Sequence, residues 1–220
     1  MLQVTLNRLK KSSSGYPILR LIYRWLYLNP WLSGNLLVVI NILGQCIVGL
    51  TDGPGAGKTT VLHALKKLGY SIAEESARAI IQERLHHNLP PRPSPREFAI
   101  KIMHRDITNY RSIEAATECI FFDRGLPDAL CMLDQVATLG QRKVTALNGR
   151  YAYHQQVLVF PPWEEIYCRD AERDQTIFDA IQTFETLSEW YRRSNYTIVE
   201  VPKAGVAERC DFVLQILGLD

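Results

Sequence analysis

The sequence has little that would place it among disulfide-stapled or zinc-binding proteins. Its five cysteines are odd in number and form no C-x-x-C pair. They are Cys46, Cys119, Cys131, Cys168 and Cys210. We therefore expect no disulfide or zinc framework, but buried or idle thiols in a reducing, cytoplasmic compartment. The five histidines show no metal-ligand spacing beyond the adjacent pair His86 and His87.

The body of the chain also lacks an excess of basic residues. Net charge is +2 over 220 residues, but five of the 25 basic residues lie in residues 1–45, which contain no acid. The remainder has 20 basic against 23 acidic residues. Because nucleic-acid surfaces need clustered Lys and Arg, we expect no nucleic-acid partner. Length and the 47% hydrophobic content fit one sizeable α/β domain, which we place at residues 45–220.

Residues 1–44 form a basic, apolar extension without a long uninterrupted hydrophobic run. A transmembrane helix needs roughly 20 mostly apolar residues. Here Arg20, Arg24 and the pair Asn29-Pro30 interrupt the run. Four interpretations stay open: a membrane span, a signal peptide, a segment that lies on a membrane surface, and a start codon located further downstream. The third would make the protein peripheral to a membrane.

The body alternates short apolar runs with amphipathic stretches. Apolar runs predict strands at residues 46–50, 70–73, 119–122, 155–160 and 197–201. Helical spacing between them includes the set Ile177, Phe178, Ile181, Phe184 and Leu187. Strands that alternate with helices predict an α/β fold, with a parallel sheet of about five strands covered by helices on both faces.

A glycine-rich loop between the first strand and the first helix of the body predicts phosphate binding. It matches the end of the pattern G-x-x-x-x-G-K-[ST], which defines P-loop NTPases. The residues expected to bind the nucleotide are Gly53, Pro54, Gly55, Ala56, Gly57, Lys58, Thr59 and Thr60. Backbone N–H groups and the helix N-terminus would surround the β-phosphate of ATP or GTP. Lys58 would bridge the β- and γ-phosphates, and the Thr59 hydroxyl would ligate Mg²⁺.

This loop departs from the pattern at one position. The first glycine falls at position 52, where this chain has Asp52. Aspartate tolerates a left-handed backbone better than most residues, so the loop is still expected to form. A carboxylate near phosphates is unfavourable, however, and predicts weaker nucleotide affinity.

Further charged residues follow the other predicted strands. Asp123 ends the run 119–122, at the sheet edge where ligands bind, and is expected to hold Mg²⁺. Arg124 could then reach a phosphate. Glu75 follows the second strand and could orient or deprotonate an acceptor hydroxyl. Arg169 and Arg173 are four residues apart, so on a helix they would share one face and could close over the transferred phosphoryl group.

The triplet His104-Arg105-Asp106 resembles the catalytic loop of protein kinases but does not support that function. Arg111 stands where that motif needs asparagine, the triplet falls inside a helical pattern, and no D-F-G follows.

The body resembles the AAA-type ATPase/kinase family that includes the ribosylnicotinamide kinase domain of NadR. The resemblance rests on the loop 51–60, Glu75-Ser76-Ala77-Arg78, the strand end 121–125, the stretch 167–173 and Val201-Pro202. It implies ATP or GTP at the loop, Mg²⁺ between Thr59 and Asp123, and a lid that contains Arg169 and Arg173. It also supports Glu75 near the acceptor.

Two functions fit these observations. The first is a kinase that transfers the γ-phosphoryl group to a small, nucleoside-like acceptor; its catalytic residues would be Lys58, Glu75, Arg124, Arg169 and Arg173. The second is a nucleotide-hydrolysing switch or binding module with a protein or membrane-lipid partner. A concave acceptor pocket beside Glu75 and Arg124 would favour the kinase, because a switch needs only a water molecule there.

Overall fold

A parallel sheet forms the centre of the fold. The computed structural model describes residues 46–219 apart from residues 54, 114–118, 138 and 168–175. Its strands are β1 (Ile47–Asp52), β2 (Ser71–Ala73), β3 (Ile120–Asp123), β4 (Gln156–Phe160) and β5 (Thr197–Glu200). They pair in the order β2-β3-β1-β4-β5, and every pairing is parallel. This confirms the predicted α/β fold, with each strand within two residues of its predicted bounds.

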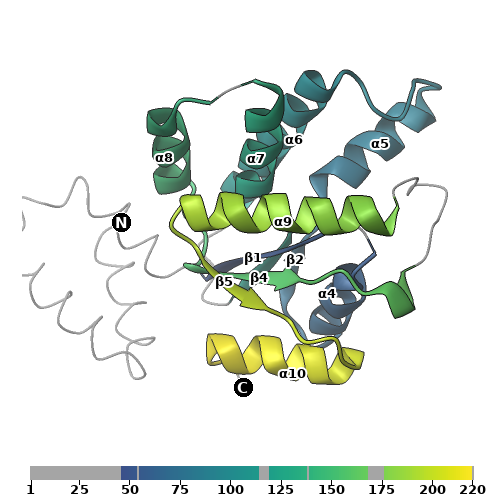
Figure 1. The fold of residues 1–220 in the computed structure, drawn as a ribbon, viewed down its shortest axis with the longest axis vertical. Coiled ribbons are helices and arrows are strands. Elements are labelled where there is room, and N and C mark those ends of the chain that lie inside the picture. Colours follow the sequence, from purple (N-terminus) through teal and green to yellow (C-terminus); the bar gives the residue numbers. More distant parts are fainter. Residues whose placement is uncertain (1–45, 54, 114–118, 138, 168–175, 220) are drawn as a thin grey trace, which may run out of the picture. The chain divides into compact units, whose positions relative to one another are not determined.

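Helices cover both faces of this sheet. They are α4 (Lys58–Lys67), α5 (Ser76–His86), α6 (Pro95–Ser112), α7 (Leu126–Val136), α8 (Gln141–Arg150), the short 3-10 helix η3 (Glu164–Ile166), α9 (Ile177–Arg193) and α10 (Val206–Leu217). Figure 1 shows α4 and α10 on one side of the strands and α9 with α7 on the other. The predicted triplet 104–106 lies within α6, so it is not a catalytic loop.

Alternation along the strands divides the core between the two faces. Leu158 and Phe160 of β4 pack with Val61 and Leu65 of α4. Val159, between them in the chain, packs with residues of α7 and α9 on the opposite face. Side chains of a strand point alternately to its two faces, so a fully buried strand must be apolar throughout. That is why these strands appear in the sequence as unbroken apolar runs.

Helix α9 buries only part of the apolar set that follows helical spacing in this segment. Its buried residues include Ala180, Leu187 and Tyr191, whereas Phe178 is 69% exposed and Ile181 41% exposed. Both stripes recur at helical spacing, so periodicity alone does not choose between them. The helix begins with a capping box, in which Thr176 and Asp179 exchange hydrogen bonds of 3.2 and 2.7 Å.

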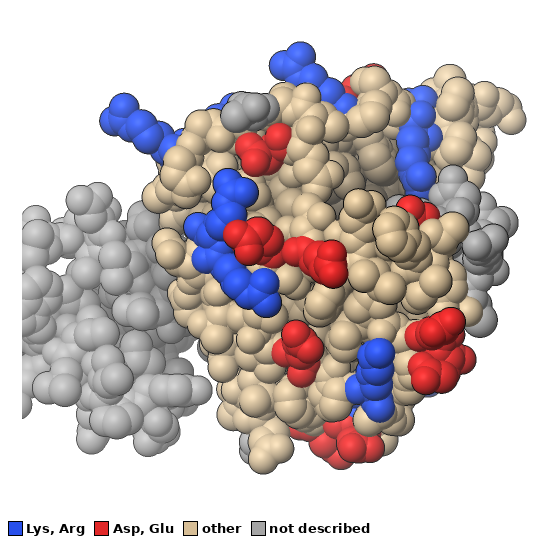
Figure 2. All heavy atoms as spheres, in the orientation of Figure 1, with Lys and Arg blue, Asp and Glu red and all other residues tan. Residues whose placement is uncertain are grey.

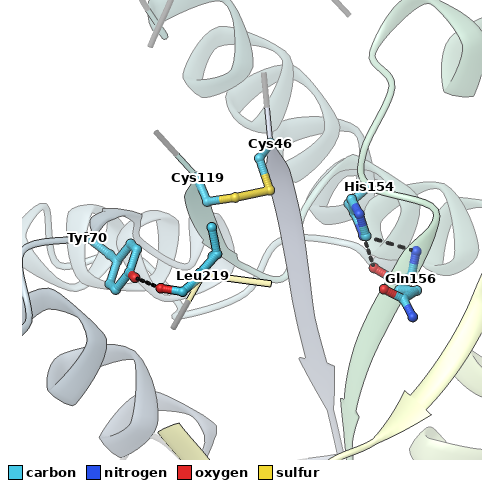
Figure 3. The surroundings of a disulfide bond; sticks show 6 residues. All are labelled: Cys46, Tyr70, Cys119, His154, Gln156 and Leu219. Atoms are coloured by element: carbon cyan, nitrogen blue, oxygen red, sulfur yellow. Dashed lines mark hydrogen bonds between the residues drawn. A yellow bond between two sulfur atoms is a disulfide. The ribbon is translucent and has the colours of Figure 1, made fainter. Parts of the chain in front are cut away.

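The prediction that all cysteines are free thiols was wrong for two of them. Cys46 and Cys119 form a disulfide, although 73 positions separate them in sequence. Figure 3 shows it joining the residues that precede β1 and β3. Those strands are neighbours, with Ile47 opposite Ile120, so the register brings the two cysteines together. Spacing along the chain cannot reveal such a pair. Cys131 and Cys210 are free and buried, and Cys168 lies outside the described residues.

The disulfide predicts a redox-dependent stability. Replacing both residues with alanine (C46A/C119A), or adding reductant, should lower the free energy of unfolding by about 2–4 kcal/mol, because the bond closes a long loop in the unfolded chain. Thermal unfolding with and without reductant measures this. Thiol titration of the denatured protein should count two more thiols after reduction. Equal counts would show that the bond does not form in solution.

The described surface offers no membrane-crossing element. No helix in residues 46–219, outside their gaps, is both long and apolar enough to span a bilayer. The predictions for residues 1–44 lie outside the described residues. On the face drawn in Figure 2, Lys and Arg are interspersed with Asp and Glu and form no continuous basic stripe.

Candidate functional site

The strand order brings the predicted site residues to one edge of the sheet. β1 lies between β3 and β4, so the loop after β1 emerges next to the end of β3. β2 lies on the other side of β3 and leads to Glu75. In parallel sheets all carboxyl ends meet at one edge, where ligands bind. Lys58, Glu75, Asp123 and Arg124 therefore converge although three separate segments supply them.

The phosphate loop has the backbone that phosphate binding needs. Gly55 and Gly57 have φ values of 86° and 76°, a left-handed region that favours glycine. Gly57 is the N-cap of α4, and no side chain caps this helix. Its first N–H groups are therefore available for a ligand, at the positive end of the helix dipole. A side chain at Gly53 would collide with the Ala180 carbonyl of α9, so the loop also packs tightly against its neighbours.

Lys58 is buried among carboxylates at the start of α4. It is 3% exposed, its Nζ contacts Asp123 directly, and Asp52 Oδ1 lies 3.7 Å away. Burial lowers the pKa of Lys58, and the Asp52 carboxylate opposes this. Thr59 lines the same cavity as Lys58, whereas Thr60 is exposed and is not part of its lining.

Arg124 is the centre of an ion-pair network. Its Nη2 lies 2.8 Å from Asp52, its Nε 3.2 Å from Glu75 and its Nη1 3.6 Å from Asp128. These three carboxylates raise the pKa of Arg124 above its usual value, although burial opposes them. Arg124 also has φ 65°, while its N–H donates to the Leu50 carbonyl at 2.8 Å. A non-glycine residue in this region indicates backbone strain of roughly 1 kcal/mol or more, and such strain clusters at functional sites.

The network sets the charge state of Glu75. Burial by itself would raise the pKa of Glu75, but Arg124, Lys58 and Arg78 together lower it. Glu75 is therefore ionised at neutral pH and can accept a hydrogen bond. Glu75 is the N-cap residue of α5, so it follows β2 as the sequence predicts.

The structure explains how Asp52 is tolerated. Asp52 ends β1, so this position does not need the left-handed backbone that the sequence led us to consider. Its carboxylate is 5% exposed and turned toward Arg124 and Lys58. Burial raises the pKa of Asp52, and the two cations partly oppose this. Asp52 thus forms an ion pair with Arg124.

Two residues of this region were missed by the sequence. Asp128 accepts from Thr51 Oγ1 and from the Tyr191 hydroxyl at 2.6 Å, and so joins α7 and α9 to β1. Its position four residues after Arg124 was the available signal. Arg209 of α10 donates to the Ala56 carbonyl at 3.2 Å, and its guanidinium lies 5.4 Å from the Trp163 ring centre. It supports the phosphate loop from outside, and nothing local in the sequence indicates this.

One continuous cavity of about 800 Å³ joins these groups. Its lining includes the phosphate-loop residues Gly55, Lys58 and Thr59 together with Glu75 and Arg124. The remaining wall comes from α5, α6, α7 and α9. Of the predicted site residues, Pro54, Arg169 and Arg173 lie outside the described residues.

A family model described as "AAA domain" matches residues 46–209. The chain belongs to this AAA domain family. Family and fold together make this AAA domain protein a P-loop phosphotransferase or ATPase. No curated protein sequence matched the chain.

Solved structures with a similar fold include deoxyadenosine kinase from M. mycoides. Its complex with dATP has a TM-score of 0.55 and 15% identity, covering 79% of this chain and 99% of that one. The complex with the products dCMP and dCDP has a TM-score of 0.54 and 16% identity, with coverages of 78% and 98%. The complex with dCTP has a TM-score of 0.51 and 16% identity, covering 79% of this chain and 98% of that one. At this identity the likeness establishes the P-loop fold of the AAA domain protein.

Asp52 should weaken nucleotide binding by this AAA domain protein. Replacing it with asparagine (D52N) removes a carboxylate near the phosphate site and keeps the side-chain size. We expect ATP to bind roughly three- to tenfold more tightly, since one like charge is removed at short range. Calorimetric titration measures this, with D211N on the exposed face of α10 as a matched control. Weaker binding in D52N would show that holding Arg124 outweighs the repulsion.

Proposed function

We propose that the protein transfers the γ-phosphoryl group of ATP to a hydroxyl of a small, nucleoside-like acceptor. The observation that supports this best is the continuous cavity. Its lining combines Lys58 and Glu75 with apolar residues that include Phe98 and Met132. A hydrolysing switch needs room only for water at this point, whereas a kinase needs a concave acceptor site. The fold shared with deoxyadenosine kinase supports the same class of acceptor.

The phosphate loop would hold the donor. Amides of the loop and the first turn of α4 surround the β-phosphate, and Lys58 reaches the β- and γ-phosphates. Lys58 now contacts Asp123. Phosphate oxygens would replace that carboxylate and leave Asp123 available. ATP and GTP both fit this description, and ATP is the donor to test first.

Thr59 and Asp123 suit a magnesium ion. Mg²⁺ prefers oxygen ligands and is usually bound by one or two protein groups together with phosphates and water. The Thr59 hydroxyl lies at the start of α4 and Asp123 at the end of β3, both beside the phosphate loop. Within the described residues no group of three or more His, Cys, Asp or Glu forms a metal site. Thr59 and Asp123 would hold the ion, which would neutralise charge on the phosphates.

Glu75 and Arg124 would position the acceptor. The ionised Glu75 accepts the hydrogen bond of the attacking hydroxyl, and Arg124 fixes Glu75 at 3.2 Å while adding positive charge near the phosphoryl group. Positioning and charge stabilisation supply most of the rate in this reaction class. Arg169 and Arg173 stay predicted lid residues that would approach the phosphates from the segment after η3.

The test is ATP consumption measured against a panel of nucleosides. We expect turnover that requires one class of nucleoside. E75Q should lower kcat by at least about 100-fold, because it removes the Glu75 carboxylate that accepts the hydrogen bond of the attacking hydroxyl. ATP affinity should stay nearly unchanged. E74Q is the matched control, since Glu74 is 85% exposed and pairs with Lys66 at 3.9 Å on the surface. Slow hydrolysis that ignores every acceptor would reject the kinase and support a switch.

A further inference from the structure

The acceptor end of the cavity contains a buried carboxylate that the proposed reaction does not use. Phe98 and Ile102 of α6 and Met132 of α7 line an apolar wall there. Asp106, also on α6, lines the same cavity and is 5% exposed. A carboxylate in apolar surroundings is costly unless hydrogen bonds or cations compensate for its burial. The partners of Asp106 therefore indicate whether it serves the fold alone.

Asp106 has little compensation within the described protein. Ser76 Oγ donates to Oδ1, and Asn109 Nδ2 donates to Ser76 Oγ at 3.3 Å. Among the described residues, Ser76 is the side chain whose hydrogen bond lowers the pKa of this carboxyl. Within the same part of the chain, Arg105 is a cation that lowers the pKa of Asp106, but it is itself paired with Glu83 at 2.6 Å.

The other charged groups around Asp106 make its ionisation harder. Glu75 at the start of α5 and Asp128 on α7 both repel its negative charge. The Asp106 carboxylate in turn contributes to the raised pKa of Tyr153, although burial is the larger cause. Burial, together with these carboxylates, raises the pKa of Asp106 to about 7, although the Ser76 hydrogen bond opposes this. A purely structural acid would be expected to have fuller compensation.

We propose that Asp106 recognises the ring of the acceptor, by accepting a hydrogen bond from an exocyclic amino group held between α6 and α7. This rests on the proposed kinase function. Ser76 connects the two ends of the acceptor site, because it follows Glu75 in the chain and donates to Asp106. A nucleoside could thus place its hydroxyl at Glu75 and its amino-bearing base against Asp106, Phe98 and Met132. The substrate class is a nucleoside with an amino group on its base.

Pairs of nucleosides that differ only by that amino group test the proposal on the full chain. Adenosine is compared with purine riboside, and cytidine with its analogue that lacks the 4-amino group. In at least one pair, removal of the amino group should lower kcat/KM roughly tenfold or more, because a buried acceptor is left without its donor. In D106L, which replaces the carboxylate with an apolar side chain, both members of that pair should react equally.

The pH dependence of the wild-type enzyme gives a second readout that needs no variant. The preference for the amino-bearing nucleoside should rise as pH increases through about 7, because the carboxylate accepts more strongly than the protonated acid. Taking the ratio within a pair removes effects of Glu75 and of the phosphates. A ratio that is flat with pH, or unchanged in D106L, overturns the proposal while leaving the kinase function standing. Failure of the wild type to phosphorylate any nucleoside overturns both.

Discussion

Lys58→Met is expected to abolish measurable turnover. Lys58 is the buried cation of the phosphate loop, and its ammonium group would contact the phosphates most directly. Its loss should reduce kcat/KM for ATP by at least about 100-fold, or roughly 3 kcal/mol, because a preorganised charge in a site with little water is worth far more than one in solvent. The effect should appear in both nucleotide affinity and kcat.

The matched control lies in the same helix. Lys67 ends α4 and is exposed, so K67M should leave ATP binding and turnover unchanged. Steady-state kinetics and equilibrium binding of ATP with Mg²⁺ distinguish the two variants. Wild-type-like affinity in K58M would show that the loop does not hold the phosphates, and the proposed function would have to be abandoned.

Arg124→Met should be the most damaging substitution for stability. It would leave Asp52, Glu75 and Asp128 in a buried site without the cation that they share. Removing one partner of a buried ion pair typically costs about 3–5 kcal/mol, because the remaining charges are desolvated and unpaired. We therefore expect a loss near that range in the free energy of unfolding, together with loss of turnover.

Two comparison variants separate the network from a general effect of losing arginine. R105M breaks the more exposed pair of Arg105 with Glu83 and should cost no more than about 1 kcal/mol. R124K keeps the charge but cannot reach three carboxylates with three separate nitrogen atoms, so it should recover only part of the stability. Chemical denaturation measures the free energy of unfolding of R124M, R105M and R124K. If R124M were as stable as R105M, the network would not hold the site together.

The sequence placed the main elements because their signals are local. Unbroken apolar runs marked the buried strands, and the glycine pattern marked the positive-φ turn at Gly55 and Gly57 in front of the helix that begins at Lys58. Asp123 and Arg124 were placed correctly at the sheet edge because a short buried strand ends in front of them. Helical spacing marked α9 but not its buried face, because Phe178 and Ile181 follow the same spacing as residues that are buried.

Contacts between distant segments were decided only by the tertiary structure. Parallel pairing of β1 with β3 placed Cys46 beside Cys119, against the expectation of free thiols. Pairing of β3 with β1 on one side and β2 on the other brought Asp52 and Glu75 to Arg124, and packing of α6 against α7 placed Asp106 in the cavity wall. Local sequence encodes backbone preference and burial, so it determined the sheet and the phosphate loop. Charge pairing depends on which strand lies next to which, and that is settled only when the whole sheet assembles.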